Sequence, residues 1–560
     1  MSKPNGGNDS GLMLILFLVL GVLFWKVWLN VEPKLIRFYL ENRYAILFSL
    51  ATVVYFLASW LLRKQAIKTA AKLKEKEIAN VEKENSTFMG YDDTGEKFYL
   101  NLDYRRMHMQ VVGTTNAGKT ESVLVPLMVD DIEKDRGFII IDGKSDMSLL
   151  NKVYGYAKKH NREQDFVLFS LTDYLKSQTY NPLMQGSVDQ VAEKVIHSFG
   201  IENEFYKVVQ FDIFRNVLGI FKSANEYPTF LKILQALNNP SQLVTLAAVG
   251  KDRLLIEWAT AFTNMNKDDR RDQISGLVSN LGYFVSGDVK TLFNVKDPMI
   301  NLKDVIEQGK ICYFQLPVLK SPMLGKSVAK MVLQDIQSQV SERHASGKDE
   351  HKFFGIFLDD FSEYLTKSFV SVLNKSRSAN VGVAFAHQAI GDLEALGPEI
   401  MNQIQTNANT KVFMRTNEPA STEYFAKTIG TKGSVKTTSR QKAGAFGKSE
   451  VTGDGSIRDV EEFMYHPNIF KRELGRGQGV VIVAHENGSK TYRVSFEMRK
   501  NLGRVHIPEV THDEVEYLDI AEDVVKTKKL SSADQNNPSF TLAGAVANNN
   551  ESEKSQRKVG

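Results

Sequence analysis

The feature that most constrains this chain is the segment GTTNAGKT at positions 113–120. It fits the pattern GxxxxGK[ST], in which glycines let backbone N–H groups curl around phosphate groups. The pattern carries weight only between a strand and a helix. Here the apolar run MHMQVV precedes the segment, and the helix-like run ESVLVPLMVDDIEKD follows it. The segment therefore predicts a phosphate-binding loop at a helix N-terminus, whose dipole also favours an anion.

This loop predicts ATP and Mg²⁺ as ligands. Lys119 is expected to reach the β- and γ-phosphates, and the Thr120 hydroxyl is expected to ligate Mg²⁺. Pro126 lies inside the following helix and is expected to kink it. The residues expected to bind the nucleotide are Gly113, Thr114, Thr115, Asn116, Ala117, Gly118, Lys119 and Thr120.

An ATPase also needs carboxylates after a buried strand, and the run FFGIFLDD at residues 353–360 supplies two. Asp359 is expected to hold Mg²⁺ through water, and Asp360 to polarise the attacking water. Alternatively, both end a strand and cap the next helix. The phosphate-binding loop upstream favours the catalytic interpretation. Gln388 ends the run VGVAFAHQ at a predicted strand tip facing the nucleotide, which makes it a candidate γ-phosphate sensor.

Short apolar runs alternate with amphipathic stretches from residue 105 onward. The runs MHMQVV, GFIIID, DFVLFS, ICYFQLP, FFGIFLDD, VGVAFAH, KVFMRT and GVVIVAH predict buried strands. Such a pattern indicates an α/β domain with a mostly parallel sheet. Residues 186–300 contain helical patterns without a strand run and predict a helical insertion. The polar, glycine-rich residues 431–458 predict a long mobile loop.

The N-terminal region carries two apolar segments, at residues 11–30 and 44–62. Each has about the 20 residues that cross a bilayer as a helix. A signal peptide is disfavoured because no small-residue cleavage site follows the first segment and a second segment does. Buried core helices are disfavoured because neither segment carries a polar stripe. The basic run RKQAIKTAAKLKEKE after the second segment places the large C-terminal part in the cytoplasm. The chain has a single cysteine, Cys312, and the absence of a cysteine pair agrees with a reducing compartment.

Together these pieces resemble the TraG/TraD family of type IV secretion coupling proteins, across residues 10–500. The family has two N-terminal spans, a phosphate-binding loop and a proline-bearing helix. The strand IIIDGKSD, with Asp142 and Lys144, is similar to the family's Asp-x-Lys element, and TYNPL to its Asn-Pro-Leu element. A helical insertion, an acidic strand end, an arginine and a strand ending in glutamine then follow in the family's order.

The resemblance implies a RecA-like homohexamer with nucleotide at the subunit interfaces. Arg377 would reach the γ-phosphate of the neighbouring subunit as an arginine finger; the plain alternative is a solvated arginine at a helix end. Arg415 is a second, weaker candidate for that role. The family usually has Asp-Glu at the acidic strand end, whereas this chain has Asp359 and Asp360. The shorter Asp360 carboxylate is expected to lie farther from the water.

The fold class implied is α/β, a RecA-like P-loop NTPase domain with an inserted all-α subdomain, preceded by two transmembrane helices. The expected division is a cytoplasmic N-terminus at residues 1–10, two transmembrane helices with a short periplasmic loop at 11–63, a linker at 64–90, the nucleotide-binding domain at 91–185 and 301–515, the all-α domain at 186–300, and a flexible tail at 516–560.

The function implied is that of an ATPase in the bacterial inner membrane. It would drive relaxase–DNA complexes, secreted proteins or both into a type IV secretion or conjugation channel. Its expected partners are the relaxosome or secreted proteins and the channel components. A DNA pump of the FtsK kind is the first alternative, disfavoured by the short polar tail. A nucleotide-binding membrane scaffold without motor activity is the second, and Asp359, Asp360 and Arg377 count against it. A net charge of +4 does not mark a dedicated nucleic-acid binder.

Overall fold

The computed structural model describes residues 18–29, 31–33, 37, 40, 42–43, 52, 55, 59–60, 62–65, 84–346, 351–366, 369–395, 397–443, 449–485 and 488–518. The chain divides into two units, Met1–Glu84 and Asn85–Gly560. In the first unit, residues 18–29 are helical and exposed. None of the helices at described positions is long and apolar enough to span a bilayer. The predicted spans at 11–30 and 44–62 lie mostly outside those positions.

The second unit is built on one large sheet with the strand order β2-β1-β13-β12-β9-β3-β8-β7-β4-β6-β5. From β9 to β5 all neighbouring strands are parallel, and every residue in these strands is buried. They are β3 (Met109–Val112), β4 (Gly137–Asp142), β5 (Phe166–Ser170), β6 (Ile311–Gln315), β7 (Phe354–Asp359), β8 (Val381–His387) and β9 (Thr410–Met414). The α/β prediction is confirmed, because each strand lies within a predicted apolar run, except that β9 begins one residue earlier, at Thr410.

The other end of the sheet is antiparallel and was only partly predicted. It consists of β12 (Gln478–His485), β13 (Gly488–Phe496), β1 (Ser86–Asp92) and β2 (Lys97–Asn101). Among these, only β12 matches a predicted run. Buried and exposed residues alternate along β2, and β13 is largely exposed over its first half. A strand with one solvated face carries too few apolar residues to form a continuous run.

Helices cover both faces of the parallel strands. Within β4, Ile139 and Ile141 belong to one hydrophobic cluster and Ile140 to another, because successive side chains of a strand point to opposite faces. The Ile140 side is covered by α3 (Val125–Glu133) and α4 (Met147–Lys159). The other side is covered by α13 (Pro322–Ala345) and α14 (Phe369–Ser376). The nucleotide-loop strand β3 thus lies inside a core closed on both faces.

A helical region separates β5 from β6 and shares the α13 core. The residues between these two strands are all described, and they contain no strand. The helices are α5 (Val188–Ser198), α6 (Glu204–Ser223), α7 (Phe230–Asn238), α8 (Ser241–Gly250), α9 (Arg253–Asn264), α10 (Lys267–Gly282), α11 (Val289–Phe293) and α12 (Leu302–Glu307). Several start at Asn, Asp, Ser or Thr caps that accept a hydrogen bond from the first turn, as at Asn203 and Asp252. The buried pair Lys194 and Asp335, 2.5 Å apart, ties α5 to α13.

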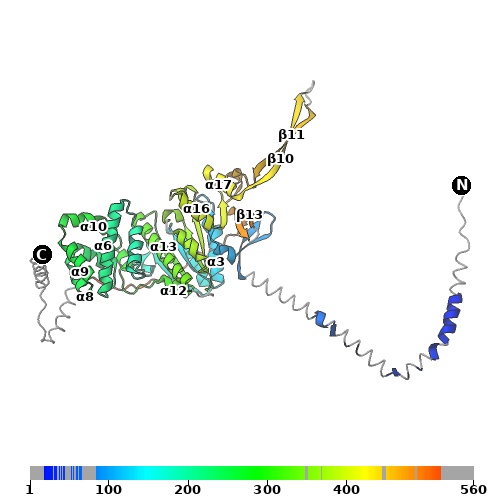
Figure 1. Ribbon diagram of the computed structural model, residues 1–560, viewed down its shortest axis with the longest axis horizontal. Coiled ribbons are helices and arrows are strands. Elements are labelled where there is room, and N and C mark those ends of the chain that lie inside the picture. Colours follow the sequence, from blue (N-terminus) through cyan, green and yellow to red (C-terminus); the bar gives the residue numbers. More distant parts are fainter. Residues whose placement is uncertain are drawn as a thin grey trace, which may run out of the picture. The chain divides into compact units, whose positions relative to one another are not determined.

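The predicted loop at residues 431–458 is instead part of a hairpin, so that prediction was wrong. Strands β10 (Thr431–Ala443) and β11 (Ser449–Phe463) pair along their full length and project from the second unit next to α17 (Pro419–Ile429) (Figure 1). An ion pair of 2.9 Å joins Lys436 to Glu462 across the strands. Residues 431–458 are polar and glycine-rich, so their sequence lacks the apolar alternation that identifies a strand.

The segment after β13 runs along the second unit in extended form. The backbone N–H of Val505 donates to Asn151 of α4 at 3.2 Å, and that of Leu518 donates to Gln235 of α7 at 3.0 Å. The segment therefore joins the sheet domain to the helical region. The remaining short elements are α2 (Leu102–Arg106), α15 (Gly391–Glu394), α16 (Pro398–Asn407), 3₁₀ turns at Glu163–Asp165, Tyr174–Lys176 and Phe361–Glu363, and π-helical turns at Lys119–Leu124 and Ile469–Glu473.

Candidate nucleotide-binding site

The loop after β3 has the conformation of a phosphate cradle. Gly118 adopts φ of 100°, a left-handed conformation that favours glycine, and an added Cβ would lie 3.1 Å from the Gly477 nitrogen. The Gly477 N–H donates to the Ala117 carbonyl at 2.9 Å, and the Thr114 N–H donates to the Arg415 carbonyl at 2.9 Å. The ends of β9 and the start of β12 thus fix the loop. The sequence analysis did not foresee the Gly477 contact.

The helix after the loop starts with the π-helical turn Lys119–Leu124 and continues as α3. Pro126 lies at the junction of the two, in the first turn of α3. A proline is tolerated there because its missing N–H belongs to the first turn. The helix changes from π to α type at this point, and the kink itself stays a prediction.

Lys119 folds back over the loop. Its ammonium donates to the carbonyl oxygens of Gly113 at 2.6 Å and Thr114 at 3.3 Å. Burial lowers the pKa of Lys119, as does the nearby charge of Lys144, and Asp359 opposes both. The lysine is thus held inside the loop at the place where an anion would be cradled.

Thr120 and Asp359 meet although they are 239 residues apart in the sequence. The Thr120 hydroxyl lies 3.0 and 2.9 Å from the two Asp359 carboxylate oxygens. Burial raises the pKa of Asp359, and the charge of Lys144 acts against this shift. A hydroxyl and a carboxylate side by side fit Mg²⁺, which prefers oxygen ligands. The described part of the chain has no group of three or more His, Cys, Asp and Glu side chains placed to hold a metal.

Asp360 follows directly in a left-handed conformation, with φ of 48°. Its Oδ2 lies 2.7 Å from the ammonium of Lys144, while its Oδ1 is buried and has no hydrogen-bond partner within the described ranges. The Lys144 contact was not predicted, although Lys144 itself was singled out. Strand pairing explains it: Asp142 at the end of β4 lies beside Asp359 at the end of β7. The loops that follow these two strands are therefore neighbours.

Gln388 follows β8, which lies between β3 and β7 in the sheet. Its Oε1 accepts a hydrogen bond from the Thr115 hydroxyl at 3.1 Å, so it reaches the loop. The preceding His387 is fully buried, its Nδ1 lies 2.8 Å from the Ala389 carbonyl, and burial lowers its pKa to about 4. The residue that precedes Gln388 therefore carries a neutral imidazole.

Arg377 lies at the other edge of the sheet. It follows α14 and precedes β8, whereas Gln388 follows β8. The seven residues of β8 span about 20 Å, which is beyond the reach of an arginine side chain. The structure therefore does not bring Arg377 to the nucleotide loop of its own chain. Arg377 lines a cavity of about 540 Å³ together with Arg106 and Lys490. Arg415 follows β9, at the loop side of the sheet.

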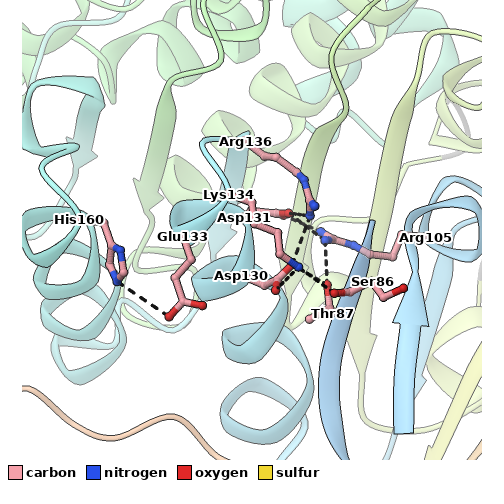
Figure 2. Close-up of polar contacts among 9 residues, drawn as sticks. All are labelled: Ser86, Thr87, Arg105, Asp130, Asp131, Glu133, Lys134, Arg136 and His160. Carbon is pink, nitrogen blue, oxygen red and sulfur yellow. Dashed lines mark hydrogen bonds and ion pairs between the residues drawn. The ribbon is translucent and has the colours of Figure 1, made fainter. Parts of the chain in front are cut away.

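A buried polar cluster fixes the C-terminal end of α3 (Figure 2). Arg105 makes two contacts with Asp131, of 2.8 and 2.5 Å, and both side chains are almost fully buried. The Thr87 hydroxyl donates to Asp130 at 2.8 Å, and Arg136 lies 3.2 Å from both aspartates. The helix that ends in α3 starts at the nucleotide loop, with the π-helical turn Lys119–Leu124. The cluster therefore fixes the position of this helix, and with it that of the loop, relative to β1 and α2.

Comparisons with known proteins agree with the resemblance seen in the sequence. Residues 354–468 match the family model described as the TraM recognition site of TraD and TraG. The type 4 coupling protein DotL of Legionella pneumophila is 23% identical over 410 residues, which is 61% of this chain and 52% of DotL. The chain therefore spans about half the length of that relative.

Solved structures of the coupling protein TrwB share the fold. The unbound monoclinic form matches with a TM-score of 0.55 and 12% identity, over 77% of this chain and 93% of that one. The complex with a non-hydrolysable ATP analogue matches with a TM-score of 0.51 and 14% identity, over 72% and 88%. This chain thus resembles type IV secretion coupling proteins of the TraG/TraD family.

Proposed function

We propose that this chain is a membrane-anchored ATPase that recruits relaxase–DNA complexes, secreted proteins or both and drives them into a type IV secretion channel. The observation that carries the proposal is the contact between Thr120 and Asp359, 239 residues apart, beside a phosphate-binding loop. The pair favours nucleotide hydrolysis over nucleotide binding alone, because the hydroxyl and the carboxylate together form a position for a metal ion beside the loop. The similarity to DotL and TrwB supports the cargo class.

The residues have separate tasks in this proposal. The loop amides and Lys119 bind the phosphates, and Asp360 accepts the proton of the attacking water. Gln388 orients that water from the tip of β8. Mg²⁺, held by Thr120 and Asp359, would neutralise charge on the phosphate oxygens. The chain supplies binding, orientation and one base, which is what phosphoryl transfer requires of a protein.

The assembly proposed is a homohexamer in the bacterial inner membrane. Residues 11–30 and 44–62 would anchor it, with the second unit in the cytoplasm. Arg377 would act on the nucleotide of a neighbouring subunit, because it lies too far from the loop of its own chain. The match of residues 354–468 to the TraD and TraG model favours a coupling protein over an FtsK-like chromosome pump.

Plasmid transfer in living cells tests the proposal. Lys119→Ala is expected to lower conjugation frequency by at least about a hundredfold while the protein still reaches the membrane fraction, because phosphate binding and charge stabilisation are lost together. Lys158→Ala, which changes an exposed lysine of α4, is the matched control and should transfer normally. Equal transfer by Lys119→Ala and the unmodified chain would refute the motor function in DNA transfer.

A further inference from the structure

Lys144 forms an ion pair in the candidate site. The hydrolysis mechanism proposed above assigns no role to this ion pair. It lies in the loop DGKSD after β4, and its ammonium is 2.7 Å from Asp360. Asp142 fixes this loop by accepting the N–H groups of Lys144, Ser145 and Asp146 at 3.0, 3.1 and 2.8 Å. The Tyr313 hydroxyl donates to the same carboxylate at 2.7 Å. These hydrogen bonds fix the backbone of the loop and therefore the point from which the Lys144 side chain extends.

The position of this lysine is central to the site. Its ammonium contacts Asp360, the residue next to the predicted metal ligand Asp359, and its charge lowers the pKa of Lys119 and opposes the rise in the pKa of Asp359. Two ammonium groups brought close together repel each other unless anions lie between them. Asp359 and Asp360 supply part of that negative charge. A terminal phosphate group would supply more.

The exposure of Lys144 differs from that of the lysine in another ion pair of the same chain. This difference distinguishes a lysine that can bind a ligand from one with a structural role. Lys194 and Asp335 are 2.5 Å apart, with 5% and 6% of their side chains exposed. In the Lys144 pair the carboxylate is similarly buried, at 8%, but the lysine side chain is 37% exposed. The Lys194 pair is closed to solvent, as a packing contact is. The Lys144 side chain is partly exposed, so a ligand that arrives from solvent can reach it.

The surroundings of Asp360 do not fully satisfy its carboxylate. Its backbone is left-handed, and its buried Oδ1 has no hydrogen-bond partner among the described residues. The Lys144 ammonium contacts Oδ2 of this carboxylate from a partly exposed side chain, so it can exchange Asp360 for another anion.

We propose that Lys144 is a second phosphate-binding lysine, specific for the γ-phosphate, which is shared between that phosphate and Asp360. The proposal rests on the proposed nucleotide function. When a γ-phosphate is bound, the ammonium moves from Asp360 onto that phosphate. With a diphosphate, Lys144 stays on Asp360. The chain would thus distinguish ATP from ADP through this residue.

The test compares the affinities of the full-length chain for ADP and for a non-hydrolysable ATP analogue. In Lys144→Met, affinity for the analogue should fall by about ten- to a hundredfold, as for the loss of one charged hydrogen bond. Affinity for ADP should stay within about twofold. Lys144→Arg, which keeps the charge, should recover most of the analogue binding. Lys119→Ala is the contrasting control, since Lys119 reaches both the β- and γ-phosphates and its loss should weaken both ligands.

Equal weakening of both nucleotides by Lys144→Met, or no weakening of either, would overturn the proposal and leave Lys144 as a structural partner of Asp360. Thermal unfolding of each variant without nucleotide shows whether the fold persists. If Lys144→Met does not fold, Lys144→Gln takes its place, because it also removes the charge but keeps a polar side chain. A loss of affinity for the analogue alone supports the proposal, and an equal loss for both nucleotides or no loss overturns it. Hydrolysis by the unmodified chain is a separate readout: selective binding without hydrolysis would refute the motor and leave the lysine proposal standing.

Discussion

At the carboxyl edge of the parallel strands, charged side chains find partners within the chain: Thr120 binds Asp359 and Lys144 binds Asp360. At the amino edge, Arg377 and Lys490 face a cavity of about 540 Å³ and form no ion pair with any described residue. Arg106, also on this cavity, has a weak contact of 3.4 Å with the exposed Asp103. At one edge the charged groups are paired with one another, and at the other three cations line a cavity that they share with a single carboxylate, Asp103.

This difference follows from the direction of the parallel strands. Parallel strands bring the loops after β3, β4, β7 and β8 together at one edge, so that edge can assemble chemistry from one chain. Arg377 precedes β8 and is carried to the other edge by the same rule. In the proposed homohexamer, a head-to-tail arrangement would bring the amino edge of one subunit to the carboxyl edge of the next.

The largest effect is expected at the carboxyl edge. Asp359→Asn keeps the shape of the side chain but removes the charge that Thr120 and a metal would share, so the ATP turnover number should fall by about a hundredfold or more. Steady-state phosphate release measures it. Asp513→Asn, an exposed carboxamide change outside the site, should leave turnover unchanged. Turnover of Asp359→Asn within a factor of about three of the unmodified chain would show that this edge is not the catalytic one.

Removal of Arg377 at the amino edge should greatly lower ATP turnover. Mixing with a second inactive variant should restore part of that turnover. Arg377→Ala is expected to lower turnover by about a hundredfold or more, as for loss of an arginine finger. If Arg377 acts across a subunit boundary, equal amounts of Arg377→Ala and Lys119→Ala subunits should regain about a quarter of full activity, because about one interface in four then has both residues intact. Both variants are inactive alone. A mixture as inactive as its components would place Arg377 outside the neighbour's site.

The two edges also differ in how far the sequence predicts them. Lys119, Thr120, Asp359 and Gln388 were placed together because each belongs to a local pattern that ends a buried strand, and such ends share one edge. The Lys144 contact was missed because it requires β4 to lie next to β7, a strand order that no local pattern contains. Strands β1, β2 and β13 were missed because solvent covers one of their faces and breaks the apolar run.

Helix α3 connects the two edges, and breaking its anchor at the amino edge should cost stability. Asp131→Ala leaves the buried Arg105 without its partner, so the free energy of unfolding should fall by about 3–5 kcal/mol. Asp103→Ala removes an exposed partner of Arg106 and should change it by less than about 0.5 kcal/mol. Urea unfolding of the two variants gives both values. Equal stability losses would mean that the cluster in Figure 2 is not an anchor.

Each edge also holds one buried histidine, which gives a smaller effect on stability. His108 lies before β3, its Nδ1 accepts the Val383 N–H at 3.2 Å, its Nε2 lies 2.9 Å from the Leu373 carbonyl, and burial lowers its pKa to about 4. His387 at the other edge also has a pKa lowered by burial to about 4. Both imidazoles are therefore neutral in the folded chain, where an unfolded histidine titrates at about 6.5.

The sign of the pH effect follows from this difference. Between pH 6.5 and 4 the unfolded chain binds protons that the folded chain refuses, so each histidine makes stability fall as the pH is lowered through that window, on the order of 1–3 kcal/mol. His108→Gln should flatten the pH dependence of the urea midpoint in this window, relative to the unmodified chain, even if the variant is less stable at every pH. His387→Gln should do the same at the nucleotide edge. If the His108→Gln and unmodified curves stay parallel from pH 7 to 4, the amino-edge histidine is not buried in its neutral form. Its contacts beside Arg377 would then need a different explanation.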